Sequence, residues 1–280
     1  MKKLLLFLAV VALSVFAIAH EFWLLPQKFF YTIRETAIIR FKVGEHFLGE
    51  NWKGSRENIQ QLLYYPPSGE VIDMSAGLSP SQGDSVRIPL KEEGTHMLVF
   101  NSTNLSINLE PEKFNASLKE EGLDQAMAYR KLQKEENKTV TEHYQRSVKT
   151  IFQVGGQLSD LVTRPTSLPL DIVPLENPYS IPDLYKTSAL KVSFRVFFKN
   201  HPLDNALVKI WYQEKGRGVT MDSLRTSKRG TITTERHPGP FMLSCVYMDH
   251  TLLPGRETEW QSYWASLSFE YSQFFSGGGH

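Results

Sequence analysis

The second half of the chain alternates apolar and polar residues with a period of two, which is the pattern of half-buried β-strands. Residues 190–198 show it most clearly, since Leu, Val, Phe, Val and Phe occupy every second position. Five segments of this kind are bounded by Gly, Pro or Asn, and they cover residues 190–198, 206–213, 230–235, 240–248 and 262–271. Their number and spacing predict an immunoglobulin-like β-sandwich over residues 183–271.

The first half repeats this pattern and then departs from it. Ile39, Phe41 and Val43 alternate with basic residues, and turn-forming clusters separate several further segments up to residue 109. Beyond Pro111 the apolar residues fall three or four positions apart, among Lys, Glu and Gln. We therefore expect an N-terminal β-sandwich domain over residues 20–163, with a helical insertion at about 112–137.

Between the halves lies a stretch too rich in proline for a helix or a central strand. Residues 164–182 contain five prolines, at positions 165, 169, 174, 178 and 182. We interpret them as a linker, and residues 272–280, with three consecutive glycines, as a flexible tail. The predicted fold is mainly β: two β-sandwich (immunoglobulin-like) domains with a helical insertion between them.

The start of the chain has the form of a secretory signal peptide over residues 1–19. Lys2 and Lys3 precede an uncharged apolar run, which closes with small residues at Ala17 and Ala19. Cleavage after Ala19 makes His20 the first mature residue, although cleavage after Ala17 is also compatible with the sequence. The only cysteine is Cys245, so we expect a periplasmic protein without an internal disulfide that is not a lipoprotein at this cleavage site.

Charge and motifs exclude several classes of function. The chain has 31 basic and 30 acidic residues, and loss of Lys2 and Lys3 leaves a net charge of −1, which argues against a nucleic-acid partner. Every later apolar run is interrupted before it could span a bilayer, so we expect no stable membrane insertion after signal cleavage. No hydrolase, zinc-protease or phosphate-loop signature is present, and we expect neither an enzyme nor a catalytic residue.

Histidines are the best candidates for chemistry. An N-terminal His20 offers a metal ion both its imidazole and the free α-amine. His96 shares strand parity with Leu98 and Phe100, so it is either a second ligand or a core histidine bonded to a backbone carbonyl. His250 follows an apolar strand and, with Asp249, offers nitrogen and oxygen in what we expect to be a loop.

Seven segments of the chain, in the same order, resemble an exported bacterial family known as a periplasmic nickel/cobalt uptake component of otherwise unknown function. They are HEFWLLP, VGEHFLGE, EHYQRSVKTIFQVG, LPLDIVPLENPY, HPLDNALVKIWY, PFMLSCVYM and WQSYWASLSFEY. The resemblance implies two β-domains and His20 as a ligand. Where the family commonly has Val-His-Met, this chain has Val246, Tyr247 and Met248, which removes one histidine unless His250 replaces it.

We therefore expect a periplasmic protein that binds a transition metal, nickel or cobalt, and delivers it to a membrane transporter, with His20, His96 and His250 as ligands. Imidazole and amine nitrogens suit copper equally well, so a copper-binding protein or a histidine-brace copper enzyme is one alternative. An adhesion or carbohydrate-binding β-sandwich, with exposed tryptophans as sugar platforms, is another.

Overall fold

The computed structural model describes residues 21–78, 84–180, 190–213, 218–251 and 259–271. The predicted signal peptide (1–19), His20 and the predicted tail (272–280) lie outside these ranges. The fold is mainly β, with 55% of residues in strands and 12% in helices, and its sheets are not closed. Among the described residues, neither helix is long and apolar enough to cross a membrane.

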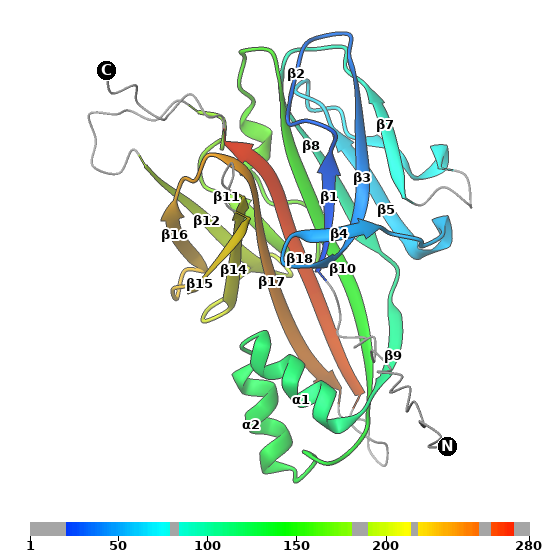
Figure 1. Cartoon of the computed structure of the whole chain (residues 1–280), viewed down its shortest axis with the longest axis vertical. Coiled ribbons are helices and arrows are strands. Elements are labelled where there is room, and N and C mark those ends of the chain that lie inside the picture. Colours follow the sequence, from blue (N-terminus) through cyan, green and yellow to red (C-terminus); the bar gives the residue numbers. More distant parts are fainter. Residues whose placement is uncertain (1–20, 79–83, 181–189, 214–217, 252–258, 272–280) are drawn as a thin grey trace, which may run out of the picture.

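A ten-stranded sheet forms the middle layer of the molecule (Figure 1). Its main path runs β15-β14-β17-β18-β10-β8-β5-β6, and β2 and β9 also pair with β10. The strands are β2 (Phe30–Tyr31), β5 (Ile59–Tyr65), β6 (Ile72–Asp73), β8 (Gly94–Ser102), β9 (Leu105–Leu109), β10 (Val140–Val154), β14 (Leu207–Gln213), β15 (Val219–Arg225), β17 (Gly239–Thr251) and β18 (Glu259–Tyr271).

Two four-stranded sheets pack against this middle layer. The first contains β1 (Glu21–Pro26), β3 (Thr36–Glu45), β4 (Leu48–Asn51) and β7 (Ser85–Pro89). The second contains β11 (Leu170–Pro174), β12 (Lys191–Phe198), β13 (His201–Pro202) and β16 (Thr231–Glu235). Short 3-10 turns lie at Arg56–Asn58, Ser75–Gly77 and Asp160–Thr163.

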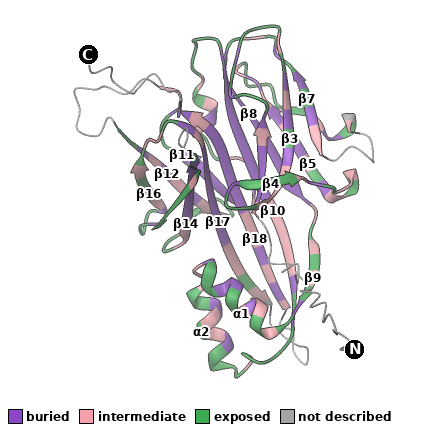
Figure 2. Cartoon of the chain, in the orientation of Figure 1, coloured by how far each residue is buried: buried purple, intermediate pink, exposed green. Residues whose placement is uncertain are grey.

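Strand β8 shows that the two outer sheets cover opposite faces of the middle sheet. Leu98 and Phe100 belong to the apolar cluster shared with the first outer sheet, whereas Met97 and Val99 belong to the cluster shared with the second. Successive side chains of a strand point to opposite faces, so β8 contributes to both cores, and all nine of its residues are buried. Figure 2 shows this burial along the middle strands. The fold thus consists of two sandwiches that share one sheet.

The halves are joined by a long parallel pair in a sheet that is mostly antiparallel. β10 pairs with β18 from Glu142 opposite Trp260 to Thr150 opposite Ser268. The two strands are long, at 15 and 13 residues. The predicted domains 20–163 and 183–271 therefore share a continuous backbone hydrogen-bond network.

Part of the predicted proline-rich linker is a strand. Residues of β11, including Asp171 and Ile172, are all buried, and β12 is its only partner among the strands that the structure describes. An edge strand tolerates proline because one side of it needs no N–H donors. The linker interpretation is therefore corrected for these residues, which belong to the second sandwich.

The helical insertion contains α1 (Pro111–Glu120) and α2 (Asp124–Leu132), which lie at the end of the middle sheet near the ends of β17 and β18 (Figure 1). Pro111 occupies the first helical turn, where its missing N–H costs no hydrogen bond. Phe114 and Leu118 are fully buried and pack with Trp260. This packing fixes the end of α1, so that Glu121 lies against the sheet beside Lys209.

Candidate functional site

The first described residue, Glu21, lies in a cluster of charged side chains at the start of β1. Ser266 on β18 donates a hydrogen bond of 2.6 Å to the carbonyl of Phe22, which holds this strand against the middle sheet. Glu21 pairs with Gly44 on β3, and its carboxylate lies 4.0 Å from the ammonium of Lys209. The cluster formed by Glu21, Glu120, Glu121 and Lys209 is called the N-terminal cluster below.

Lys209 is the centre of the N-terminal cluster. Its ammonium is 2.7 Å from Glu121 and 3.4 Å from Glu120, and the residue is only 5% exposed. Burial alone would lower the pKa of Lys209, but the surrounding carboxylates outweigh it and the pKa is raised. With all groups ionised, three carboxylates surround one ammonium, so the cluster has two uncompensated negative charges.

Burial is the main cause of the shifted pKa values of the carboxyl groups in the cluster. Burial raises the pKa of Glu21 to about 7, with Lys209 opposing the shift and Glu121 and Glu120 adding to it. Burial also raises the pKa of Glu121, again against the effect of Lys209. Near neutral pH the Glu21 carboxyl therefore exchanges a proton readily, and a nearby cation would favour its ionised form.

A small cavity lies beside Glu21, between β1 and strands β17 and β18. Its volume is about 10 Å³, close to the smallest that holds one water molecule. Glu21, Glu121, Ser244 and Trp264 line it, together with Cys245. Burial raises the pKa of the Cys245 thiol to about 12, so this sulfur stays protonated and is a poor metal ligand.

His96 is a core residue with both ring nitrogens engaged. The Tyr64 hydroxyl lies 2.6 Å from Nδ1, and the carbonyl of Glu92 lies 3.2 Å from Nε2. The imidazole stacks between Tyr64 and Phe152 and is completely buried. Burial lowers the pKa of His96 to about 4, against a smaller opposing effect of Glu92. Of its two predicted roles, the structure matches the core histidine bonded to a backbone carbonyl.

His250 lies within β17, because that strand continues to Thr251, and not in the expected loop. Its ring lies 3.9 Å from that of Tyr129 on α2 and 5.4 Å from that of Trp260, measured between centroids. The backbone N–H of His250, rather than the imidazole, donates to the Asp249 carboxylate.

His96 and His250 are too far apart to bind one ion. His96 lies opposite Phe152 of β10, whereas His250 lies opposite Trp260, which is itself opposite Glu142 of β10. Glu142 and Phe152 are ten positions apart, which is about 33 Å along a strand. Within the described ranges, no group of three or more His, Cys, Asp or Glu side chains could hold a metal ion. The three predicted ligands therefore do not form one site, and His20 lies outside the described residues.

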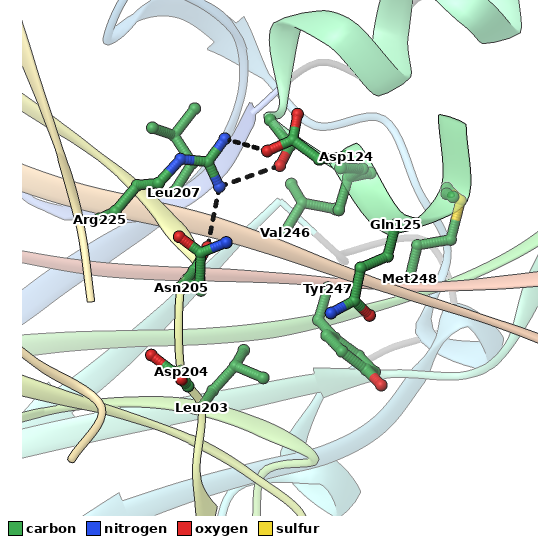
Figure 3. Close-up of a pocket in the computed structure, with 14 residues that line it drawn as sticks. Asp124, Gln125, Leu203, Asp204, Asn205, Leu207, Arg225, Val246, Tyr247 and Met248 are labelled. Atoms are coloured by element: carbon green, nitrogen blue, oxygen red, sulfur yellow. Dashed lines mark hydrogen bonds and ion pairs between the residues drawn. The ribbon is translucent and has the colours of Figure 1, made fainter. Parts of the chain in front are cut away.

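A larger pocket lies between the N-terminus of α2, residues 203–207 and β17 (Figure 3). Its volume is about 260 Å³. Arg225 closes one side, donating 2.7 Å to Asp124 and 2.8 Å to the carbonyl of Asn205, while Val246 and Met248 supply apolar surface. Because the Arg225 guanidinium already has protein partners, the pocket has no free cationic group of its own among the side chains that line it.

The sequence interpretation did not identify the N-terminal cluster. One signal was available, since Lys209 is the single charged residue of its strand and lies between the apolar residues Val208 and Ile210. A lysine at such a position requires buried partners. The sequence could not show which carboxylates these are, because Glu21 and Glu121 are distant from Lys209 along the chain.

A family model described as a domain of unknown function, DUF4198, matches residues 17–249. No curated protein matches the sequence. Among solved structures, a Salmonella alpha-2-macroglobulin is 11% identical, with a TM-score of 0.23, over 89% of this chain and 15% of that one. The D0-D1 domain of intimin is 9% identical, with a TM-score of 0.19, over 89% of this chain and 97% of that one. At these scores the likenesses carry no argument about function.

Proposed function

This chain belongs to the DUF4198 family of domains of unknown function, and we propose that it is an exported protein that binds a transition-metal ion at the start of its mature chain. In this proposal His20 supplies the imidazole and the α-amine, and the N-terminal cluster supplies carboxylate oxygen. The cargo is nickel or cobalt. The protein binds it in the periplasm and delivers it to a membrane transporter. Copper is the alternative metal.

The observation that carries the proposal is the surroundings of Glu21. Glu21 follows His20 directly in the sequence. The proposed nitrogen ligands therefore belong to the residue next to a member of the N-terminal cluster. Three carboxylates around the single ammonium of Lys209 leave negative charge that a divalent cation would compensate. Nitrogen and oxygen donors suit nickel, cobalt and copper, but they do not select among them.

The proposed ligands differ from the set expected from the sequence. A role for His96 would require loss of both of its hydrogen bonds inside the core. His96 and His250 are ten strand positions apart along the sheet, so the proposal does not place them on one ion. Oxygen from Glu21 or Glu121 replaces these nitrogens in the proposal.

Metal titration of the purified mature protein tests this function. Intact mass first establishes that the chain begins at His20, and calorimetry then measures the Kd for nickel, cobalt and copper. We expect at least one Kd below about 10 μM, equivalent to a binding free energy of about −7 kcal/mol. We expect His20→Ala to weaken binding at least tenfold and Glu21→Gln to weaken it severalfold. His201→Ala, in an exposed position of β13, is the matched control and should leave the Kd unchanged.

The pH dependence separates this site from an adventitious surface site. Metal binding must displace the proton of Glu21, whose pKa is about 7, and that of the α-amine, whose usual pKa is about 8. Affinity should therefore rise between about pH 6 and pH 8, and Glu21→Gln should make this rise shallower. Equal affinity of wild type and His20→Ala, or no binding of any of the three ions, would contradict the proposal.

A copper enzyme is distinguished by its product. If copper alone binds tightly, and the copper-loaded protein forms hydrogen peroxide that His20→Ala abolishes, the histidine-brace alternative replaces metal delivery.

A further inference from the structure

A buried lysine and a buried aspartate meet where the middle sheet faces the second outer sheet. Lys149 of β10 and Asp171 of β11 are in direct contact through Nζ and Oδ1. Their side chains are 1% and 2% exposed, so water does not reach the pair. Neither residue belongs to the N-terminal cluster or to the proposed metal site.

The hydrogen bonds around this pair are strongly asymmetric. The second carboxylate oxygen, Asp171 Oδ2, accepts a 2.7 Å hydrogen bond from the backbone N–H of Thr166 and a 2.9 Å hydrogen bond from its hydroxyl. Apart from their mutual contact, Lys149 Nζ and Asp171 Oδ1 have no hydrogen-bond partner within the described residues. An ammonium group has three donors, so at least two of them remain unsatisfied.

Such an ion pair is costly to bury. Desolvation of two charges is offset only when the remaining donors and acceptors are also satisfied, and here they are not. Condensation of the two groups into an amide removes both charges at once. Lysine amines act as nucleophiles in proteins, and the strands hold this one against the carboxyl group, so the reaction needs no diffusional encounter.

We propose that Lys149 and Asp171 condense spontaneously into an intramolecular isopeptide bond. A proton first passes from Nζ to Oδ1, which gives a neutral amine and a carboxylic acid. The amine lone pair then attacks Cγ of Asp171 and forms a tetrahedral intermediate. Its negative charge develops on Oδ2, where the two donors of Thr166 stabilise it.

The reaction balances without any other reagent. Oδ1 takes a second proton from the nitrogen and leaves as water, so the Nζ–Cγ bond forms and the Cγ–Oδ1 bond breaks. No oxidant, reductant or cofactor is required. The product joins β10 of the middle sheet covalently to β11 of the second outer sheet.

Mass spectrometry of the folded wild-type protein tests the proposal directly. We expect an intact mass that is lower than the sequence mass of the mature chain by one water molecule. A tryptic digest should contain one branched peptide in which Lys149 is joined to Asp171. Full mass and two separate linear peptides would show an ion pair only and would overturn the proposal.

Two variants and one internal comparison test which side chains form the isopeptide bond. Lys149→Arg keeps the positive charge but cannot form this amide, so its mass should equal its sequence mass. Thr166→Val removes the hydroxyl donor and should increase the fraction of unreacted chain. Lys209 is an internal comparison in the same digest, because it also contacts a buried carboxylate and should give no branched peptide. If Lys149→Arg does not fold, the wild-type digest alone still decides the question.

Discussion

At the scale of single residues, His96 shows how burial turns a titratable group into a source of pH-dependent stability. The folded state keeps its imidazole neutral down to about pH 4, whereas the unfolded chain takes up a proton near pH 6.5. The contribution of the neutral His96 side chain to the free energy of unfolding is therefore complete above pH 6.5. It is lost as the pH falls from 6.5 to 4. The loss is about 3 kcal/mol, and urea unfolding at a series of pH values measures it.

A variant without a titratable group isolates this effect. We expect His96→Gln to be about 2 kcal/mol less stable than wild type at pH 7.5, because a stacked and hydrogen-bonded ring is lost from the core. Below pH 6 the difference in free energy of unfolding between wild type and His96→Gln should become smaller. A parallel pH dependence in both proteins would show that another group is responsible.

The same residue marks a limit of sequence-based prediction. Strand parity predicts that His96 points to the same face of the sheet as Leu98 and Phe100. In the structure it stacks on Phe152, which belongs to the same apolar cluster as those two residues. Whether its nitrogens are free depends on Tyr64, 32 residues away, and on a backbone carbonyl. Neither partner leaves a local pattern in the sequence. The N-terminal cluster escaped prediction for the same reason, since long-range contacts bring its charges together.

At the scale of elements, the helical insertion depends on one buried arginine. Arg130 of α2 donates 3.0 Å to Asn115 of α1 and about as closely to the carbonyls of Glu136 and Lys138. Its guanidinium also lies 5.0 Å from the centre of the Phe114 ring. A single side chain thus joins both helices and the segment that leads back to β10.

We predict that Arg130→Met loosens the insertion without unfolding the sheets. Loss of several hydrogen bonds to a charged donor should lower the local free energy of opening by about 3 kcal/mol. Amide hydrogen exchange should become faster over residues 111–138 and stay unchanged in β8 and β10. Lys131→Met, one position along and exposed, is the control and should have little effect. Faster exchange throughout the sheets would contradict a local role.

The elements also show which patterns in the sequence were informative. The five alternating segments of the second half are the strands β12, β14, β16, β17 and β18, and the change of period after Pro111 marks the helices. β11 was missed because prolines surround it, although it needs hydrogen bonds on one side only. β15 was missed because nearly all of its residues are exposed, which leaves no apolar alternation to detect.

At the scale of the whole molecule, the shared middle sheet determines how the protein unfolds. β10 and β18 come from different halves of the sequence and pair over nine residue pairs. Separating the halves would leave each with an exposed edge where this pairing is lost. We therefore expect residues 20–271 to unfold together in one cooperative transition, and calorimetry should give equal calorimetric and van't Hoff enthalpies.

Fragments provide the matching test. Residues 20–163 and 164–271, produced separately so that β11 stays with β12, should aggregate or lack a cooperative transition, and their co-expression should restore a soluble complex. Two fragments that fold independently, with separate transitions in the intact chain, would contradict this prediction.

The contact between the two ends of the described chain also sets an order of events during synthesis. Ser266 and Ser268 of β18 donate to the carbonyls of Phe22 and Leu24, 244 positions earlier. A chain that emerges with its N-terminus first cannot make these contacts until residues 266–268 have been released. β1 therefore cannot complete its contacts before β18 is synthesised, and the first sandwich stays incomplete until then. Such long-range contacts slow folding, and under the proposed export this delay would keep the chain unfolded during transport.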